Sequence, residues 1–294
     1  MKVAGFTFIR NAIANDYAIV EAITSILPIC DEFIVAHGNS TDDTLSLIKN
    51  INSPKIKIIQ TVWDDNLRSG GKTFALETDK AFDAISKDVD WAFYIQGDEC
   101  VHEQYLATIT NAMQQCLAQK QIEGLLFNYL HFYGSYDFFA QSRRWYRREV
   151  RIIRNLPGMH SYKDAQGFRY NDRKIKVKHI YAFIYHYGWV KPPSSLNYKV
   201  RNFNQFYTTD DKWIEETYPE FSDFNYENAD QLFKFEGTHP RVMQERIAKS
   251  NWKFNFDPTL SQNKLPLRRR LLQKIEHFTN VRLFEYKNYK IIDN

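Results

Sequence analysis

The segment FYIQGDECV, residues 93–101, joins an apolar run to two adjacent carboxylates. The run is typical of a buried strand, and Gly97, Asp98 and Glu99 stand where that strand would end. In open α/β sheets, ligands bind beyond the carboxyl ends of the strands. A carboxylate at that edge can hold a divalent cation against a phosphate. The alternative interpretation is an ordinary turn that caps a helix in VHEQYLATI.

Polar residues also follow two earlier apolar runs. Arg10 and Asn11 come directly after KVAGFTFI, while His37 ends EFIVAH and Asn39 lies just beyond it. With Gln96, which precedes the two carboxylates, these side chains are expected to meet at one edge of a sheet. Polar groups converging at strand ends form a crevice of the size of a nucleotide.

The elements that must position these residues alternate along the first hundred positions. Asn15 or Asp16 is predicted to cap the first helix, Pro28 to end it, and Gly70 and Gly71 to open the third helix. The expected strands are 2–9, 32–37, 55–63 and 90–96, and the expected helices are 15–27, 40–51 and 69–85. This β-α-β-α-β-α-β order predicts a mostly parallel, doubly wound sheet.

After about residue 125 the pattern changes. Strand-like segments at 123–134, 143–155 and 173–189 predict an antiparallel portion added to the same sheet, the last as one strand or two. Residues 195–250 are polar and helical in character, and an amphipathic helix is predicted from Pro266. We expect two parts, a main domain over 1–240 and a basic, partly helical extension over 241–294 packed on it.

The composition is that of an ordinary globular protein. The chain has 294 residues, of which 44% are hydrophobic and 25% charged, with a net charge of +4. Residues 264–294 carry eight basic and three acidic residues, so the basic character belongs to this tail. Cys30, Cys100 and Cys116 lack paired spacing and predict reduced thiols in the cytoplasm. The first residues are expected to form a strand rather than a signal peptide, and no apolar run reaches membrane-spanning length.

Five segments together resemble the family 2 glycosyltransferases. FIVAHGNSTDDT (33–44) resembles the strand and acidic-Gly-Ser-Thr-Asp-Gly-Thr turn of that family, and DWAFYIQGDECV (90–101) resembles its Asp-X-Asp-Glu segment. SGGKTFAL (69–76) stands where the family has a helix start with small residues. RIIRNLPGMHSYKDAQGF (151–168) resembles the acceptor-side segment, and YHYGW (185–189) a later strand end that bears a His. The resemblance covers roughly the first 190 residues.

This resemblance implies a GT-A fold, an α/β fold with a doubly wound, mostly parallel sheet, here with an antiparallel portion and a helical C-terminal extension. It implies a cytoplasmic enzyme that transfers a sugar, with inversion, from a nucleotide-diphosphate sugar to a glycan or glycolipid acceptor, as in surface polysaccharide synthesis. It also implies a divalent cation, Mn²⁺ or Mg²⁺, held by Asp98 and His186. Two positions depart from the family pattern, because Gln96 replaces its first acid and His37 stands where it has acidic residues.

Other residues are assigned roles on the same resemblance. Lys72, at a helix start, is expected to help bind the diphosphate, and Gln96 the ribose. Asp164 is the expected catalytic base, with His160 as the runner-up. Trp189 is expected to stack on a sugar face. For each of these residues, and for His186, an ordinary structural role is the alternative: a solvated lysine, a loop aspartate or a packed core side chain.

Several alternatives remain open for the whole chain. A sugar nucleotidyltransferase would need a glycine cluster after the first strand, which FTFIRNAIAN lacks. A glycosyltransferase-like domain that only binds a glycan or a partner is the non-enzymatic alternative. RRWYRREVRIIR (143–154) suggests nucleic-acid binding, a charged edge strand or contact with an anionic acceptor, and we expect no nucleic-acid partner. The tail helix either packs on the core or lies peripherally on an anionic membrane surface at its inner face.

Overall fold

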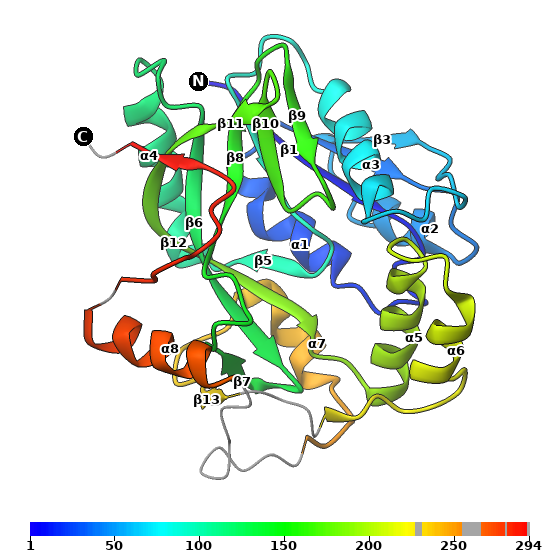
Figure 1. Cartoon of the computed structure of the whole chain (residues 1–294). Helices are drawn as coiled ribbons and strands as arrows, with labels where there is room; N and C mark the ends of the chain where they lie inside the picture. Colours follow the sequence, from blue (N-terminus) through cyan, green and yellow to red (C-terminus); the bar gives the residue numbers. More distant parts are fainter. Residues whose placement is uncertain (227–230, 255–265, 280, 293–294) are drawn as a thin grey trace.

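The structure, a computed structural model, describes residues 1–226, 231–254, 266–279 and 281–292 (Figure 1). Its elements, in chain order, are β1 (Val3–Ile9), α1 (Ile19–Ile26), η1 (Leu27–Ile29), β2 (Glu32–His37), α2 (Thr44–Lys49), β3 (Ile56–Gln60), α3 (Lys72–Asp83), β4 (Trp91–Tyr94), β5 (Glu99–Val101), η2 (Glu103–Tyr105), α4 (Leu106–Cys116), β6 (Gly124–Tyr133), β7 (Ser135–Ala140), β8 (Arg148–Arg154), β9 (Met159–Tyr162), β10 (Gly167–Tyr170), β11 (Arg173–Lys174), β12 (Lys176–Trp189), α5 (Pro193–Asn204), α6 (Asp211–Thr217), β13 (Leu232–Lys234), η4 (Arg241–Met243), α7 (Gln244–Ala248), α8 (Leu267–Thr279) and β14 (Lys290–Ile291).

One large sheet organises the chain, with neighbouring strands in the order β13-β7-β6-β8-β4-β1-β2-β3. The four strands β4, β1, β2 and β3 are parallel. Strands β8, β6 and β7 continue the sheet in antiparallel pairs, and β12 pairs with β6, β5 and β14. A small antiparallel sheet contains β9, β10 and β11. The expected α/β fold, with parallel strands first and an antiparallel portion later, is confirmed.

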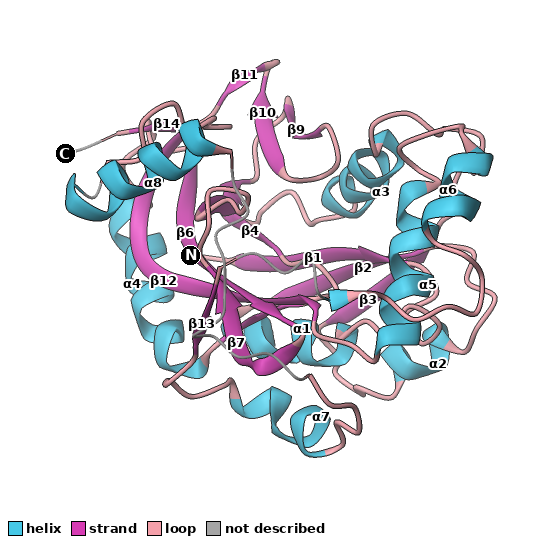
Figure 2. Cartoon of the chain, turned by 60° about the horizontal axis from the view of Figure 1, so that its bottom comes forward, coloured by secondary structure: helices cyan, strands magenta, loops and turns pink. Residues whose placement is uncertain are grey.

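The sheet is covered on both faces because side chains alternate along its strands. In β1, Val3 and Ile9 pack with α1 and α4, whereas Ala4 and Phe6 pack with α3 and the small sheet. Figure 2 shows α1 below and α3 above strands β1, β2 and β3. A doubly wound sheet of this kind leaves the carboxyl ends of its parallel strands free for a ligand.

The helix starts show where local sequence decides structure and where it does not. Helix α3 begins after Gly71, whose φ of 69° is easily adopted only by glycine, as predicted. The predicted cap of α1 is wrong, because the helix begins at Ile19 after Ala18, without a side-chain cap. Asp16 has a φ of 49°, and its carboxylate accepts a hydrogen bond from Arg246 at 2.6 Å instead.

Helices α5 and α6 lie side by side near the carboxyl ends of β1 and β2 (Figures 1 and 2). The backbone N–H of Gly71 donates to the carbonyl of Phe206 at 3.0 Å. The guanidinium of Arg68 donates to the carbonyl of Gln205 at 2.9 Å and pairs with Asp211. These contacts fix the α5–α6 segment against the loop that leads into α3.

The C-terminal part of the chain returns to the strands of the first part. The predicted helix from Pro266 is confirmed as α8, and Glu276 on it accepts a hydrogen bond from Arg143 at 2.7 Å. Strand β14 lies parallel to β12, with Lys290 opposite Lys176. The division at residue 240 stays a prediction, and part of the basic tail lies outside the described residues. In the part of the chain that the structure describes, no helix is both long and apolar enough to cross a membrane.

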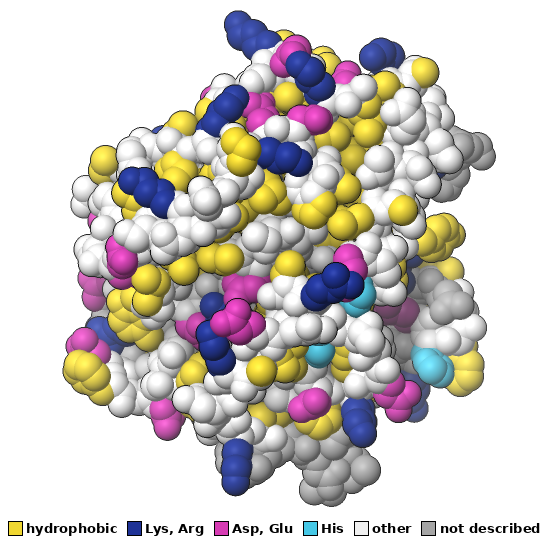
Figure 3. Space-filling view, turned by 180° about the vertical axis from the view of Figure 1, so that it is seen from behind, with side chains coloured by type: hydrophobic (Ala, Val, Ile, Leu, Met, Phe, Trp, Pro, Cys, Tyr) yellow, Lys and Arg dark blue, Asp and Glu magenta, His cyan; other side chains and the backbone are white. Residues whose placement is uncertain are grey.

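Several arginines of segment 143–154 have partners within the protein. Arg151 pairs with Glu99, and the two side chains have no exposed surface. Arg154 donates to the carbonyls of Ile122 at 2.6 Å and Cys116 at 2.7 Å. Figure 3 shows the face behind that of Figure 1, where basic and acidic side chains are interspersed with hydrophobic ones. The segment therefore serves largely as an internal framework.

Candidate active site

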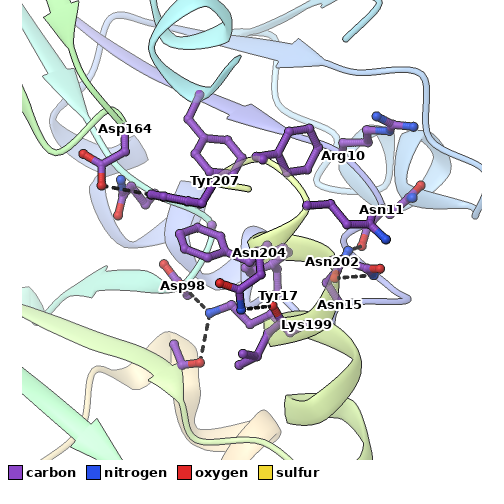
Figure 4. Close-up of a pocket in the computed structure, with 18 of the residues that line it drawn as sticks. Arg10, Asn11, Asn15, Tyr17, Asp98, Asp164, Lys199, Asn202, Asn204 and Tyr207 are labelled. Atoms are coloured by element: carbon purple, nitrogen blue, oxygen red, sulfur yellow. Dashed lines mark hydrogen bonds and ion pairs between the residues drawn. The ribbon is translucent and has the colours of Figure 1, made fainter. Parts of the chain in front are cut away.

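A cavity of about 860 Å³ lies at the carboxyl ends of β1 and β4 (Figure 4). Arg10 and Asn11 enter it after β1, and Gln96 and Asp98 after β4. Helix α5 and the residues after it form another wall, and Asp164 comes from the loop between β9 and β10. The volume is in the usual range for small-molecule sites, roughly 300–1,000 Å³.

Asp98 is held in this cavity by a lysine. It is 9% exposed, and Lys199 Nζ donates a hydrogen bond to its Oδ2 at 2.8 Å. The same ammonium donates to the carbonyl oxygen of Gly188 at 2.9 Å. Burial by itself would raise the pKa of Asp98, but neighbouring positive charge, that of Lys199 first, holds the pKa well below its usual value. Asp98 is therefore an ionised, paired carboxylate.

His186 faces Asp98 with an unprotonated nitrogen. His131 Nε2 lies 2.7 Å from the carbonyl of Tyr146, which can only accept, so Nε2 carries the proton. Burial lowers the pKa of both histidines and so favours their neutral forms. The two Nδ1 atoms are 3.2 Å apart, so His186 Nδ1 donates to His131 Nδ1. The remaining Nε2 of His186 keeps its lone pair and lies 3.8 Å from Asp98 Oδ2.

Gly188 closes the space between these groups. A Cβ atom at this position would lie 2.7 Å from both Asp98 Oδ2 and His186 Nε2. The backbone N–H of Tyr187 donates to the carbonyl of Asp98 at 2.8 Å. Strand β12 therefore passes directly beside the Asp98 turn, and with Asp98 and His186 in these positions a side chain at residue 188 would collide with both.

Glu99 has a structural role. Its carboxylate accepts from Arg151 Nε and Nη2, each at 2.8 Å, and from the hydroxyl of Tyr129 at 2.8 Å. The backbone N–H of Gln96 donates to it at 3.1 Å. Because all these donors converge on a fully buried carboxylate, Glu99 fixes the turn that presents Asp98 and is not available as a ligand.

The expected divalent cation can be tested against these groups. Asp98 Oδ2 and His186 Nε2 could both donate electron pairs to one ion, but the ammonium of Lys199 lies on that carboxylate oxygen. Gln96 adds no charge. In residues 1–226, 231–254, 266–279 and 281–292 no group of three or more His, Cys, Asp or Glu side chains is placed to hold a metal. Mg²⁺ and Mn²⁺ can bind through one or two carboxylates together with phosphates and water, but here the Lys199 ammonium holds the carboxylate oxygen that the ion would need, so the arrangement does not fit the ion.

Asp164 lies on another wall of the cavity, as the expected base requires. The hydroxyl of Tyr207 donates to its Oδ2 at 2.9 Å, and burial followed by the charge of Asp164 raises the pKa of that hydroxyl. Its neighbours Lys163 and Ala165 have φ values of 57° and 61°, so the loop is bent tightly on both sides of the carboxylate. His160, the alternative base, does not line the cavity and lies 3.4 Å from Asp172.

The other predicted site residues divide into two groups. Arg10, Asn11, Gln96 and Trp189 line the cavity together with Asp98, Asp164 and His186. His37, Asn39 and Lys72 do not. His37 Nδ1 lies 2.9 Å from Gln60 Oε1, Asn39 Oδ1 accepts from the backbone N–H of Trp63 at 3.1 Å, and Lys72 is exposed. Their roles in binding stay predictions.

Helix α5 supplies residues that the sequence analysis missed. Lys199, Asn202 and Phe203 line the cavity at the i, i+3 and i+4 spacing of one helix face, and Phe206 lines it from the turn after the helix. Asn202 also donates to Asn15 Oδ1 at 3.3 Å. This spacing could have predicted the contact from the sequence. A polar helix with an Asn, a Lys and aromatic residues on one face is expected to direct that face toward a ligand or another part of the protein.

Aromatic rings form the upper wall of the cavity. Phe74 stacks on Phe203 with ring centroids 5.2 Å apart, and Phe206 lies 5.1 Å from Phe74 and 5.5 Å from Trp63. These rings join α3 to α5 and its following turn. They offer flat apolar surface beside the polar floor, an arrangement that suits a ligand with both ring and charged parts.

Comparisons with known proteins find structures that are similar to part of this chain. No family model and no curated protein matches the chain. The structure of S. aureus TarS residues 1–349 in complex with UDP is 13% identical, with a TM-score of 0.39, over 74% of this chain and 69% of that one. A glucosyl-3-phosphoglycerate synthase from Mycobacterium tuberculosis, solved with Mn²⁺, UDP and phosphoglyceric acid, is 20% identical, with a TM-score of 0.30, over 45% of this chain and 43% of that one.

A third structure is of another class. The 4-diphosphocytidyl-2C-methyl-D-erythritol synthase from Anaerococcus prevotii DSM 20548 is 12% identical, with a TM-score of 0.34, over 84% of this chain and 95% of that one. The chain is therefore similar, over part of its fold, to two proteins that were solved with UDP and to this synthase.

Proposed function

We propose that this chain is a GT-A glycosyltransferase that moves a sugar from a nucleotide-diphosphate sugar to a hydroxyl group of a glycan or glycolipid acceptor. The observation that carries the proposal is the cavity, in which a charged floor and a separate carboxylate face the same space. Asp98 and Lys199 form the floor at the end of β4, and Asp164 lies on another wall. Ligands of doubly wound sheets bind at this edge.

The chemistry assigned to the cavity is displacement at the anomeric carbon. The acceptor oxygen forms a bond to C1 of the sugar while the bond from C1 to the phosphate oxygen breaks, and the diphosphate leaves with the electron pair. Asp164 takes the proton of the acceptor hydroxyl as general base. Attack from the face opposite the leaving group inverts the configuration at C1. Tyr207 donates to Asp164 Oδ2, so Oδ1 remains to accept the proton.

The donor would lie between the polar floor and the aromatic wall. Arg10 and Asn11 reach the cavity from β1, close to where α5 presents Asn202. Phe74, Phe203 and the other wall rings offer surfaces on which a base or a sugar face can stack. The divalent cation implied by the resemblance is left out of this proposal, because the ammonium of Lys199 holds the carboxylate oxygen that the ion would need.

Binding and turnover test the proposal in sequence. Thermal unfolding is measured with the diphosphates of uridine, guanosine, cytidine and thymidine, each with and without Mn²⁺, since a ligand at a hundredfold excess over its Kd stabilises the fold by about 2.7 kcal/mol. One nucleotide is expected to raise the Tm. Sugar derivatives of that nucleotide are then offered with glycan acceptors, and product is detected by mass spectrometry. If none of the four nucleotides shifts the Tm, the proposal is wrong; binding without turnover of any donor would indicate the non-enzymatic alternative.

A lipid-linked acceptor would bring the chain to a membrane surface, and α8 suits such contact. No residue of α8 is buried, and Leu267, Leu271 and Phe278 are 81%, 62% and 84% exposed. Arg268, Arg269, Arg270 and Lys274 lie on the same helix. We propose that this basic, apolar face binds an anionic lipid surface, because its charge is opposite to that of the lipid and its apolar side chains can enter the interface.

A further inference from the structure

Lys199 occupies an unusual position for a lysine on a helix. Its side chain is 12% exposed, and its ammonium contacts Asp98 Oδ2 and the carbonyl of Gly188 at 2.8 and 2.9 Å. It also lies 5.1 Å from the centre of the Tyr17 ring. Figure 4 shows its dashed contacts beside Asp98 on the floor of the cavity. A positive charge is thus built into the place where the resemblance expects a metal ion.

The Lys199 ammonium has one N–H donor more than its two contacts use. A lysine carries three N–H donors, and in the described part of the chain two of them are directed to Asp98 and Gly188. Lys199 lines the cavity, so the third donor is available to a group bound there. The two fixed contacts restrict the otherwise flexible side chain, which is the condition for a preorganised anion site.

The surrounding charges favour an anion. Lys191 is 2% exposed, lies 5.1 Å from the Tyr17 ring and donates to the backbone carbonyl of Asp16. Glu99 is neutralised by Arg151, as described above. Burial lowers the pKa of the Lys191 ammonium to about 7, so Lys199 supplies the fixed positive charge beside Asp98 on the cavity floor.

We propose that Lys199, oriented by Asp98, binds and neutralises the diphosphate of the donor in place of a divalent cation. This inference rests on the proposed function and names how that site holds its ligand. A phosphate oxygen accepts the third N–H of Lys199, and the ammonium stabilises the charge that develops as the diphosphate leaves. A divalent cation on Asp98 Oδ2 would have to displace Lys199 and then face its charge.

Equilibrium binding tests the inference on the full chain. Kd values for the same four nucleoside diphosphates are measured by calorimetry, once with EDTA and once with Mn²⁺. The expected result is that one nucleotide binds in EDTA with a Kd within twofold of that in Mn²⁺. Lys199→Met should weaken its binding at least tenfold, and Lys199→Arg should restore most of the loss. Binding that requires Mn²⁺, and is unchanged or tightened by Lys199→Met, would overturn the inference.

Two further variants keep the test independent of folding. Lys199→Met leaves the buried carboxylate of Asp98 unpaired, so Lys199→Met/Asp98→Asn supplies a neutral pair and should still bind weakly while unfolding like the wild type. Lys212→Met removes one lysine from α6, where the side chain is 85% exposed, and should leave Kd unchanged. If a nucleotide binds only with Mn²⁺, this inference is wrong but the proposed function still holds. If no nucleotide binds in either condition, both are wrong.

Discussion

The hydroxyl of Tyr207 donates to Asp164 Oδ2 at 2.9 Å, across 43 positions of sequence. This hydrogen bond joins the loop between β9 and β10 to the turn after α5. It engages one oxygen of the carboxylate and holds Asp164 in a defined position, as the proposed base requires. The proposed role of Asp164 as the base is the first to be tested.

Asp164→Asn should lower the rate of transfer by about 100-fold or more, because the amide cannot take the proton of the acceptor. Its Kd for the nucleotide should stay within twofold of wild type. The rate is measured as release of nucleoside diphosphate from the donor. Asp172→Asn is the control, since its carboxylate is 97% exposed in the neighbouring β10–β11 turn. An unchanged rate in Asp164→Asn would mean that another group is the base.

Breaking the Arg151–Glu99 pair should cost about 3–5 kcal/mol of unfolding free energy, because the remaining charge would be buried without a partner. Arg151→Met is the variant, and urea denaturation is the measurement. The double variant Arg151→Met/Glu99→Gln should recover a large part of the loss, since neither side chain is then charged. A loss below about 1 kcal/mol in the single variant would place this pair among the weak, surface-like ones.

Glu149 on β8 should make stability depend on pH. It is 4% exposed, Oε2 has no hydrogen-bond partner in the described part of the chain, and burial raises its pKa from 4.5 to about 8. Between these values the folded chain keeps a proton that the unfolded chain has lost, so this group's contribution to stability falls as the pH rises. Below pH 4.5 that contribution is fully present, and above about pH 8 it is lost.

Glu149→Gln should remove this dependence. Relative to wild type, the variant should gain on the order of 2–4 kcal/mol between pH 5 and pH 8. Urea denaturation at several pH values measures the difference, and Glu216→Gln on α6, where the side chain is 67% exposed, is the control. A difference that does not change with pH would show that Glu149 is ionised in the folded chain over the whole range.

The α8 face should bind vesicles that contain phosphatidylglycerol and leave vesicles of pure phosphatidylcholine in solution, as a basic amphipathic helix does. Leu271→Glu/Phe278→Glu should abolish sedimentation with the anionic vesicles, and high salt should weaken it. Leu76→Glu on α3 changes a leucine that is 51% exposed outside this face and serves as the control. Equal sedimentation of the wild type and the α8 variant would rule out this contact.

The sequence was informative wherever a local pattern decided the structure. The apolar run before Gln96 predicted β4, and the parallel arrangement of the first strands followed from the alternation of strands and helices. Together these placed Arg10, Asn11 and Asp98 at one sheet edge, where the structure has them. The glycine start of α3 was equally local, because a positive φ at Gly71 needs no distant partner.

Contacts between residues far apart in the sequence could not be predicted from local sequence patterns. Lys199 meets Asp98 across 101 positions, and no spacing rule connects them. Asp16 resembled a helix cap, but Arg246, which lies 230 positions away, binds its carboxylate. The carboxylate of Glu99 looked like half of an acidic pair until the buried Arg151 gave it a structural role. In each case the fold brings together two charged side chains that are far apart in the sequence.

Gly188 places a limit on how sequences of this kind can diverge. The acids, bases and lysine around it can be exchanged one at a time, and the chemistry of the cavity would shift with each exchange. The space between Asp98 and His186 has no such freedom, because any added carbon would lie 2.7 Å from both. Sequences that drift from this one are therefore expected to keep glycine at this position as long as they keep Asp98, His186 and the course of β12 beside the Asp98 turn.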